Sequence, residues 1–264
     1  MSGTRCGTSG APRRKAVQIK GALHVHSYLS HDGTLTVPEL IEWYSRHGYQ
    51  FVAIGEHSQD MDETKAQILI AQSAEHSSSR FCVIPGIEYA CEGGLHIVGV
   101  GVAALIRDIE PVAVVDVIHQ CGGFAILAHP KRDGWECAPQ VVRAVDAAEI
   151  WNVAYDGKFL PSPQSLMGFP RMREINPRLL AVAGHDFHRK VGFYDVGIVM
   201  DVPALSTGAI IGNLQQGRFE IRAPFFCAKP QAQFSFLESA RLRFLSWQLS
   251  KVKQARDLVL RLCS

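Results

Sequence analysis

The residues in this sequence that could do chemistry are histidines and carboxylates with recurring spacings. His24 and His26 are separated by one residue, and Asp186 and His188 repeat that spacing with a carboxylate in the first position. Side chains two positions apart point to the same side of a β-strand. Each pair could therefore bind one metal ion through two side chains.

Five more residues extend this set of candidate metal ligands: Asp32, His57, Glu88, His96 and His129. A catalytic zinc takes three protein ligands plus water, so nine candidates imply two or three divalent ions. Imidazole and carboxylate ligands without thiolate suit Mn, Fe or Zn. A carboxylate such as Glu88 could bridge two ions, and ions about 3.5–4 Å apart can activate water at neutral pH.

Alternating strands and helices are expected to position these residues. The expected strands are 22–26, 51–54, 81–84, 95–100, 124–127, 148–151, 179–183 and 196–200, and the clearest helices follow Thr36 and span 62–75 and 112–120. This alternation favours a parallel α/β barrel. The carboxyl ends of barrel strands share one face, so we expect the nine candidates to converge there.

The distribution of charge limits the classes of partner. The chain has a net charge of +2, but residues 1–20 carry five basic residues and no acid, and residues 229–264 carry seven basic residues and two acids. The remaining body has a net charge of −8. An acidic body disfavours a broad surface for nucleic-acid phosphates and is compatible with bound cations.

Composition excludes several other classes. Hydrophobic residues make up 47% of the chain, which excludes a wholly disordered protein. No apolar run approaches the length of a membrane span, and no signal peptide is evident. The seven scattered cysteines form no C-x-x-C pair, so we expect reduced thiols and a cytoplasmic location, with attachment to a membrane surface as an alternative.

Five segments carry a resemblance to a known family: GALHVHSYLSHDGTLTVPELIEWYSRHGYQFVAIGEHS (21–58), VIPGIEYACEGGLHIVGVG (83–101), AILAHPKR (125–132), AEIWN (148–152) and AGHDFHR (183–189). In this order they resemble the PHP (polymerase and histidinol phosphatase) superfamily of metal-dependent phosphoesterases, and most closely its stand-alone enzymes. The resemblance covers about 21–225. It implies a distorted (β/α)7 TIM-like barrel that holds up to three divalent ions.

The resemblance also implies how the ligands are grouped. His24, His26, Glu88 and Asp186 would hold the first ion, Glu88, His96 and His129 the second, and Asp32, His57 and His188 the third. Glu56 stands where the family usually has Asp, and we expect it to orient His57 rather than to bind metal. His31 precedes Asp32 where the family usually has Ser, so it could compete as a ligand.

The predicted activity is hydrolysis of phosphate esters of small molecules or nucleotides, by attack of a metal hydroxide on phosphorus. Lys131, Arg132 and Arg189 follow candidate ligands closely and could bind phosphate oxygens. For Lys131 and Arg132, it is an equally good interpretation that both side chains lie in a loop and are only solvated. His185 could protonate the leaving group.

Other functions stay open at this point. They are a 3′–5′ exonuclease or short-RNA nuclease, a hydrolase of a non-phosphate ester or carbamate, and a metal-bearing accessory module without activity. The acidic body counts against long nucleic acids. The complete ligand set counts against the accessory module, whose expected mark is missing ligands.

The expected domain organisation has three parts: a disordered basic segment at 1–16, the metallohydrolase barrel at 17–228, and a basic amphipathic helical tail at 229–264. One stripe of the tail is apolar, and it includes Leu242, Leu245, Leu249, Val252 and Val259. We expect this stripe to dock on the barrel or on another subunit. Binding to an anionic membrane surface is the alternative.

Overall fold

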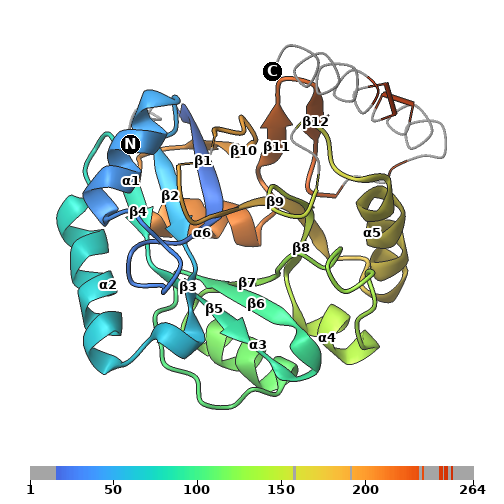
Figure 1. The fold of residues 1–264 in the computed structure, drawn as a ribbon, viewed down its shortest axis with the longest axis horizontal. Coiled ribbons are helices and arrows are strands. Elements are labelled where there is room, and N and C mark those ends of the chain that lie inside the picture. The colour runs from blue at the N-terminus through green and yellow to red at the C-terminus, as the bar shows by residue number, and fades with distance from the viewer. Residues whose placement is uncertain are drawn as a thin grey trace, which may run out of the picture.

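The computed structural model describes residues 16–156, 159–190, 192–231, 234, 244–245, 247–248 and 251. Its centre is one sheet of twelve strands: β1 (Val17–Val25), β2 (Phe51–Ile54), β3 (Glu56–His57), β4 (Cys82–Ile84), β5 (Gly86–Ala90), β6 (His96–Val100), β7 (Phe124–Leu127), β8 (Ala147–Asn152), β9 (Leu180–Phe187), β10 (Gly197–Val202), β11 (Glu220–Ala223) and β12 (Phe226–Ala228). Figure 1 shows the helices arranged around these strands.

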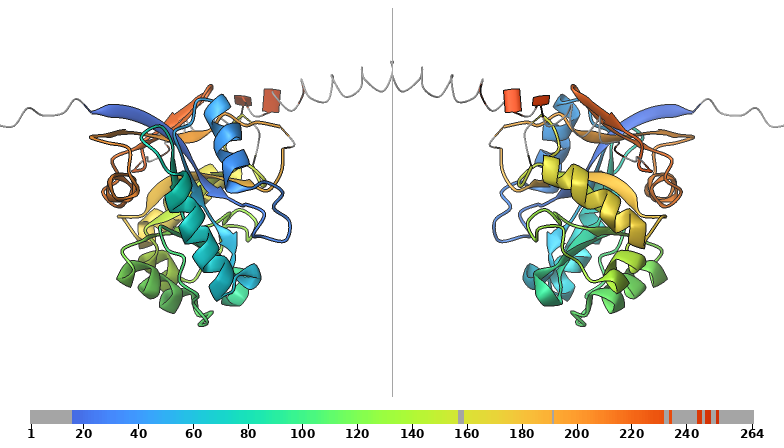
Figure 2. Two further views of the ribbon diagram at one scale, coloured as in Figure 1. Left: turned by 90° about the vertical axis from the view of Figure 1, so that its left-hand side faces the viewer. Right: turned by 90° about the vertical axis from the view of Figure 1, so that its right-hand side faces the viewer.

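Six α-helices lie in the described part of the chain: α1 (Val37–Arg46), α2 (Glu63–His76), α3 (Pro111–Gln120), α4 (Pro139–Ala144), α5 (Pro163–Ile175) and α6 (Thr207–Gln215). Helices α1 and α2 lie on one side of the molecule, and α4 and α5 lie on the opposite side (Figure 2). Among the described residues, no helix is both long enough and apolar enough to cross a membrane. The mixed α/β fold expected from the sequence is confirmed.

The expectation that the sheet is parallel throughout is wrong. Strand β1 pairs in parallel with β2 and β9, and β8 pairs in parallel with β7 and β9, as expected. However, β10 runs antiparallel to β1, and β6 runs antiparallel to both β5 and β7. Only residues 91–95 connect β5 to β6. A parallel connection needs a crossover of a dozen or more residues, so this short link returns the chain in the opposite direction.

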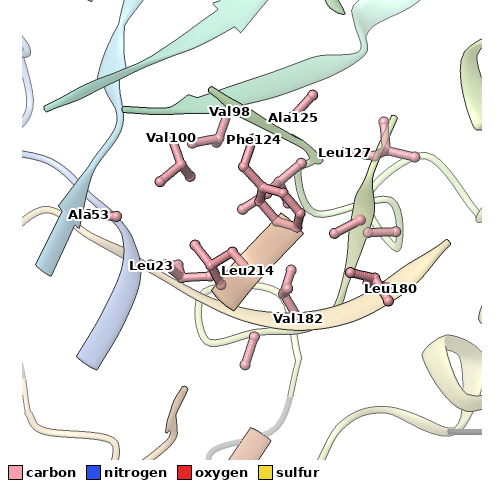
Figure 3. Close-up of a cluster of buried hydrophobic side chains, with 14 of the residues drawn as sticks. Leu23, Ala53, Val98, Val100, Phe124, Ala125, Leu127, Leu180, Val182 and Leu214 are labelled. Atoms are coloured by element: carbon pink, nitrogen blue, oxygen red, sulfur yellow. The ribbon is translucent and has the colours of Figure 1, made fainter. Parts of the chain in front are cut away.

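The core lies between the strands and extends under the helices. Figure 3 shows side chains from several strands, including Leu23, Val98 and Val182, gathered with Leu214 of α6 in one apolar cluster. A second cluster lies where Leu40 of α1 packs near strands β1 and β2. Strands covered on both faces bury every residue, which explains why β2 reads as a continuous apolar run.

Helix α1 begins at the residue that the sequence indicates. Thr36 is its N-cap, and the side chains of Thr36 and Glu39 each accept a hydrogen bond from the other's backbone N–H, which forms a capping box. The helix follows the loop that carries Asp32, so its start fixes one end of that loop.

We expect Thr36→Ala to lower the free energy of unfolding by about 1 kcal/mol, because it removes the cap. In a chain of this size, that loss lowers the Tm by about 2–4 °C. Thermal unfolding followed by circular dichroism measures the shift. Thr64→Ala, at an exposed position inside α2, is the control, and equal Tm values for the two variants would show that the capping box contributes nothing.

The predicted segments at the two ends of the chain lie almost entirely outside the described residues. This applies to the basic segment at 1–16 and to most of the tail at 229–264. The partners expected for the tail therefore stay predictions.

Candidate metal centre

The nine predicted ligands come together at one end of the strands. His24 lies in β1, one residue before its end, and His26 directly follows the strand. His57 lies in β3, Glu88 in β5, His96 in β6 and Asp186 in β9, and the adjoining loops carry Asp32, His129 and His188. Their ligand atoms form groups within 4.8 Å of one another: His24, His26 and Asp186; His26, His57 and His188; His31, Asp32 and His57; and Glu88, His96 and His129. The expected convergence is therefore present.

The buried carboxylate of Glu88 lies at the centre of these groups. Its Oε1 is 2.7 Å from His96 Nδ1 and 2.9 Å from His129 Nε2. Its Oε2 is 2.9 Å from His57 Nδ1 and 3.5 Å from His24 Nε2. Each oxygen thus faces a different set of imidazoles, which is the geometry a bridging carboxylate requires.

His24, His26 and Asp186 form the most deeply buried of the groups. The Nε2 atoms of His24 and His26 lie 3.7 Å and 3.5 Å from Asp186 Oδ1. Both Nε2 atoms are buried, and neither has a hydrogen-bond partner in the described part of the chain. A buried polar atom without a partner is costly. A cation among these atoms would remove that cost, so this donor set fits a divalent ion.

Three candidate ligands have unusual backbone conformations. The φ angles of His24, His129 and Asp186 are +60°, +31° and +47°, in a region that non-glycine residues rarely occupy. Strained residues of this kind cluster at functional sites. The register of β1 also shifts between Ala22 and Val25. The side chains of His24 and His26 are therefore brought together by a bulge rather than by the regular alternation expected from the sequence.

Glu149, in β8, holds two of the imidazole-bearing segments in place. Its Oε1 accepts a hydrogen bond from His24 Nδ1 at 2.8 Å, and its Oε2 accepts from the backbone N of His129 at 2.7 Å and from Asn152 Nδ2 at 2.8 Å. Donation from Nδ1 leaves the lone pair of His24 on Nε2, the atom that faces Glu88 and Asp186.

The electrostatic environment of His24 reflects these contacts. Burial disfavours the charged imidazole, but the carboxylates of Glu149, Glu88 and Asp186 outweigh burial, so the pKa of His24 is raised. Burial likewise opposes ionisation of Asp186, yet the nearby His24 and His26 hold its pKa well below the usual range. Burial lowers the pKa of His26 to about 4, so the group combines a stabilised carboxylate and the proton-attracting imidazole of His24 with a neutral imidazole at His26.

The hydrogen bonds of Glu56 lead, through a serine, to a different histidine from the one expected. Its carboxylate accepts hydrogen bonds from Ser27 N at 3.0 Å and from Ser30 Oγ. Ser30 Oγ in turn lies 3.3 Å from His26 Nδ1 and accepts from the backbone N of His57 at 3.0 Å. Glu56 therefore acts through Ser30, and the imidazole that it orients is that of His26 rather than that of His57.

The outermost group contains Asp32. Its carboxylate oxygens lie 3.3 Å from His57 Nε2 and 3.3 Å from His188 Nε2, as expected for residues that share an ion. The neighbouring His31 has its Nδ1 2.8 Å from Asp60 Oδ2. Asp60 thus engages one nitrogen of His31, whereas Asp32 faces the two histidines directly.

The residues proposed to contact substrate differ in their surroundings. Lys131 donates to Tyr155 O, and Arg132 donates to Gly94 O, so both cationic groups have protein partners. Arg189 is exposed and lines a pocket of about 420 Å³ next to Asp186 and His188, so of the three it is the best placed to meet a ligand.

His185 lies in the wall of the same pocket, but its two ring nitrogens are engaged. Tyr44 OH donates to Nδ1 at 2.9 Å, and Nε2 donates to Val196 O at 2.5 Å. Burial lowers the pKa of His185 to about 4. The neutral ring therefore connects α1, β9 and the start of β10, and this arrangement leaves neither nitrogen free for a leaving group.

Because Gly184 has no side chain, the carboxylate of Glu149 fits beside it. A Cβ at this position would lie 1.8 Å from Glu149 Oε1. We expect Gly184→Ala to move the carboxylate away from His24 and to weaken metal affinity by about tenfold, the lower end of the range for residues that orient metal ligands. Gly208→Ala in α6 is the control, since nothing lies near its Cβ. If calorimetry gives Gly184→Ala and Gly208→Ala the same metal affinity, this role of Gly184 is contradicted.

Comparison with known proteins identifies the fold. No family model and no curated protein matches the sequence. Among solved structures, one match is a two-domain protein from Bacteroides vulgatus that contains a predicted PHP-like metal-dependent phosphoesterase, with a TM-score of 0.57, 15% identity, and coverage of 84% of this chain and 70% of that chain. The chain has a PHP-like fold.

Two other solved structures match the same fold. PsfC from Pseudomonas syringae has a TM-score of 0.57 and 14% identity, and the match covers 89% of this chain and 98% of PsfC. The lesion-specific endonuclease EndoQ from Pyrococcus furiosus has a TM-score of 0.52 and 12% identity, over 78% of this chain and 58% of that protein. The PHP resemblance seen in the sequence is confirmed at the level of the fold.

Proposed function

We propose that this protein is a metal-dependent hydrolase of phosphate esters of small molecules or nucleotides. The observation that carries the proposal is the convergence of nine imidazoles and carboxylates, Glu88 at their centre, with buried nitrogens that a cation would satisfy. Strand β1 pairs with both β2 and β9. We infer from this pairing that the strands enclose the core as a distorted barrel, with the site at one end.

The donor set fits two or three divalent ions of Mn, Fe or Zn. The residues that would hold them are His24, His26, Glu88 and Asp186; Glu88, His96 and His129; and Asp32, His57 and His188. Such ions neutralise phosphate charge and lower the pKa of water. The site holds three ions if the outermost group (Asp32, His57 and His188) binds one, and two ions if it does not.

The protein's own residues orient the reacting groups. Glu149 and Ser30 fix the ring positions of His24 and His26, so their Nε2 atoms face the site. Arg189 would bind phosphate oxygens from the adjoining pocket. Proton transfer to the leaving group is not assigned to His185, because both of its nitrogens are engaged.

A substrate screen tests the proposal. The purified chain, supplied separately with Mn²⁺, Fe²⁺ and Zn²⁺, is assayed with phosphate monoesters, phosphodiesters, oligonucleotides and carbamates. We expect metal-dependent release of phosphate from monoesters, lost in His129→Ala and kept in His76→Ala, whose histidine lies on α2 outside the site.

Other outcomes would redirect the proposal. Cleavage of oligonucleotides alone would favour the nuclease alternative, and cleavage of carbamates alone would favour the non-phosphate one. Hydrolysis that persists both in a metal chelator and in His129→Ala would contradict a metal-dependent activity.

A further inference from the structure

His31 and Asp60 form a hydrogen-bonded pair beside the outermost group of candidate ligands. Asp60 Oδ2 accepts two hydrogen bonds from His31, one from the backbone N at 2.9 Å and one from ring Nδ1 at 2.8 Å. The side chain of His31 is 63% exposed, whereas that of Asp60 is 17% exposed. A solvent-facing imidazole is therefore held in one position by a carboxylate that is itself partly buried.

These hydrogen bonds determine which ring nitrogen of His31 can bind a cation. An ionised carboxylate only accepts hydrogen bonds, so Nδ1 carries the ring proton and the lone pair of the neutral ring lies on Nε2. Glu149 holds His24 in the same way, by accepting a hydrogen bond from its Nδ1. In many metal sites, a carboxylate accepts from one nitrogen of a histidine while the other nitrogen binds the ion. The pair thus has the arrangement of a metal-binding histidine and its orienting carboxylate.

The ring of His31 lies next to the other candidate ligands of this region. His31, Asp32 and His57 each contribute one ligand atom to a group in which these atoms lie within 4.8 Å of one another. The ring centroids of His31 and His57 are 5.5 Å apart. His188 Nε2 lies 3.3 Å from Asp32 Oδ2 and 3.4 Å from His57 Nε2. Asp32 and His57 therefore belong to two overlapping sets of donors, one completed by His31 and one by His188.

The loop between β1 and α1, which carries Asp32, is fastened on both sides of this group. On one side it is held by Asp60, which lies three residues after His57. On the other side, the backbone N and Oγ1 of Thr34 donate to the carbonyl oxygen of His188 at 2.9 Å and 3.0 Å. Donors that are held in place before an ion arrives lose little freedom when they bind it. The loop is thus attached to the two segments that supply the other ligands.

We propose that His31 is a fourth ligand of the outermost group, through Nε2, and that Asp60 is the residue that orients it. His31 then binds the same ion as Asp32 instead of competing with it. Three imidazoles and one carboxylate suit Zn or Fe better than Mn. This inference rests on the proposed metal-dependent function and requires that the chain binds three ions.

Calorimetric titration of the metal-free full chain with Zn²⁺ tests the inference. We expect three equivalents to bind to the unaltered chain. In His31→Ala and in Asp60→Asn, the affinity for one equivalent should fall by about 10- to 100-fold or more, while the other two equivalents bind as before. Asp116→Asn, at an exposed position in α3, is the control for the change of charge and should bind all three unchanged.

A second variant separates a ligand from a residue that only holds the loop. Lys65 Nζ donates to Leu29 O at 2.9 Å, so it fastens the same loop without touching His31. Lys65→Met should keep three equivalents with nearly unchanged affinities. If Lys65→Met and Asp60→Asn weaken binding equally, attachment of the loop explains the effect and the proposal is overturned. Two equivalents in the unaltered chain would also overturn it, while leaving a two-ion hydrolase intact.

Long-range ¹H–¹⁵N spectra of the histidine rings detect coordination directly. The signals of His31 are those missing from the spectrum of His31→Ala. We expect the Nε2 signal of His31 to shift when the full chain is loaded with Zn²⁺, and that of His76 on α2 to stay in place. If the His31 signal shifts but no phosphate ester is cleaved, the hydrolase proposal fails and His31 remains a ligand. An Nε2 signal of His31 that zinc leaves unchanged would overturn the proposal.

Discussion

Replacing Glu88 with alanine should lower the turnover of phosphate monoesters by about a thousandfold or more. Metal ions contribute several kcal/mol of transition-state stabilisation, and each 1.36 kcal/mol is a factor of ten in rate. The carboxylate lies within 2.9 Å of His57, His96 and His129, so its loss removes a donor shared by two groups of candidate ligands. The metal content of the purified variant should fall with its turnover.

Two further variants make the Glu88 result interpretable. Glu88→Gln keeps the volume of the side chain but loses its charge, and we expect it to lose activity as well. Glu63→Ala removes an exposed carboxylate at the start of α2 and should leave turnover unchanged. Circular dichroism establishes that each variant is folded. A folded Glu88→Ala protein with full activity would contradict the bridging role.

The second large effect is expected for Glu149→Gln, which should weaken metal affinity by about 10- to 100-fold. The two carboxylate oxygens accept hydrogen bonds from His24 Nδ1, the backbone N of His129 and Asn152 Nδ2. A glutamine has one carbonyl oxygen, so its amide N–H groups must face at least one of these donors. The imidazole of His24 then loses the partner that fixes its orientation.

Calorimetric titration with Mn²⁺ measures this change in affinity. Glu75→Gln, at an exposed position in α2, is the matched control and should bind metal as the unaltered chain does. An unchanged Kd in Glu149→Gln would show that the hydrogen bonds of Glu149 do not affect the ion-binding atoms.

The buried strands and the ligands at their ends could be predicted from the sequence. Strands β2 and β7 have the expected bounds, because each is a short apolar run with both faces covered. His57 and His129 follow the ends of these two runs within three residues. A polar residue after a buried strand is a strong local signal, so the convergence of the candidate ligands followed from local patterns.

Features set by contacts distant in sequence could not be predicted. Helix α5 contains Gly168 and Pro170, both poor helix formers, yet the ring of Trp135 packs where a Cβ of Gly168 would lie. Glu149 lies in the segment AEIWN (148–152), and the sequence left open whether it has a function or only closes the edge of the barrel. Its position inside the apolar run of β8 was the available signal, but its partners His24 and His129 are remote in sequence.

The number of ions bound per chain tests the central claim most directly. Protein freed of metal by chelation is loaded separately with excess Mn²⁺, Fe²⁺ and Zn²⁺, dialysed, and analysed for its metal content. We predict two or three equivalents of at least one of these metals, and at least one equivalent fewer in Glu88→Ala. A folded chain that retains none of the three metals would contradict the claim that these imidazoles and carboxylates form a metal centre.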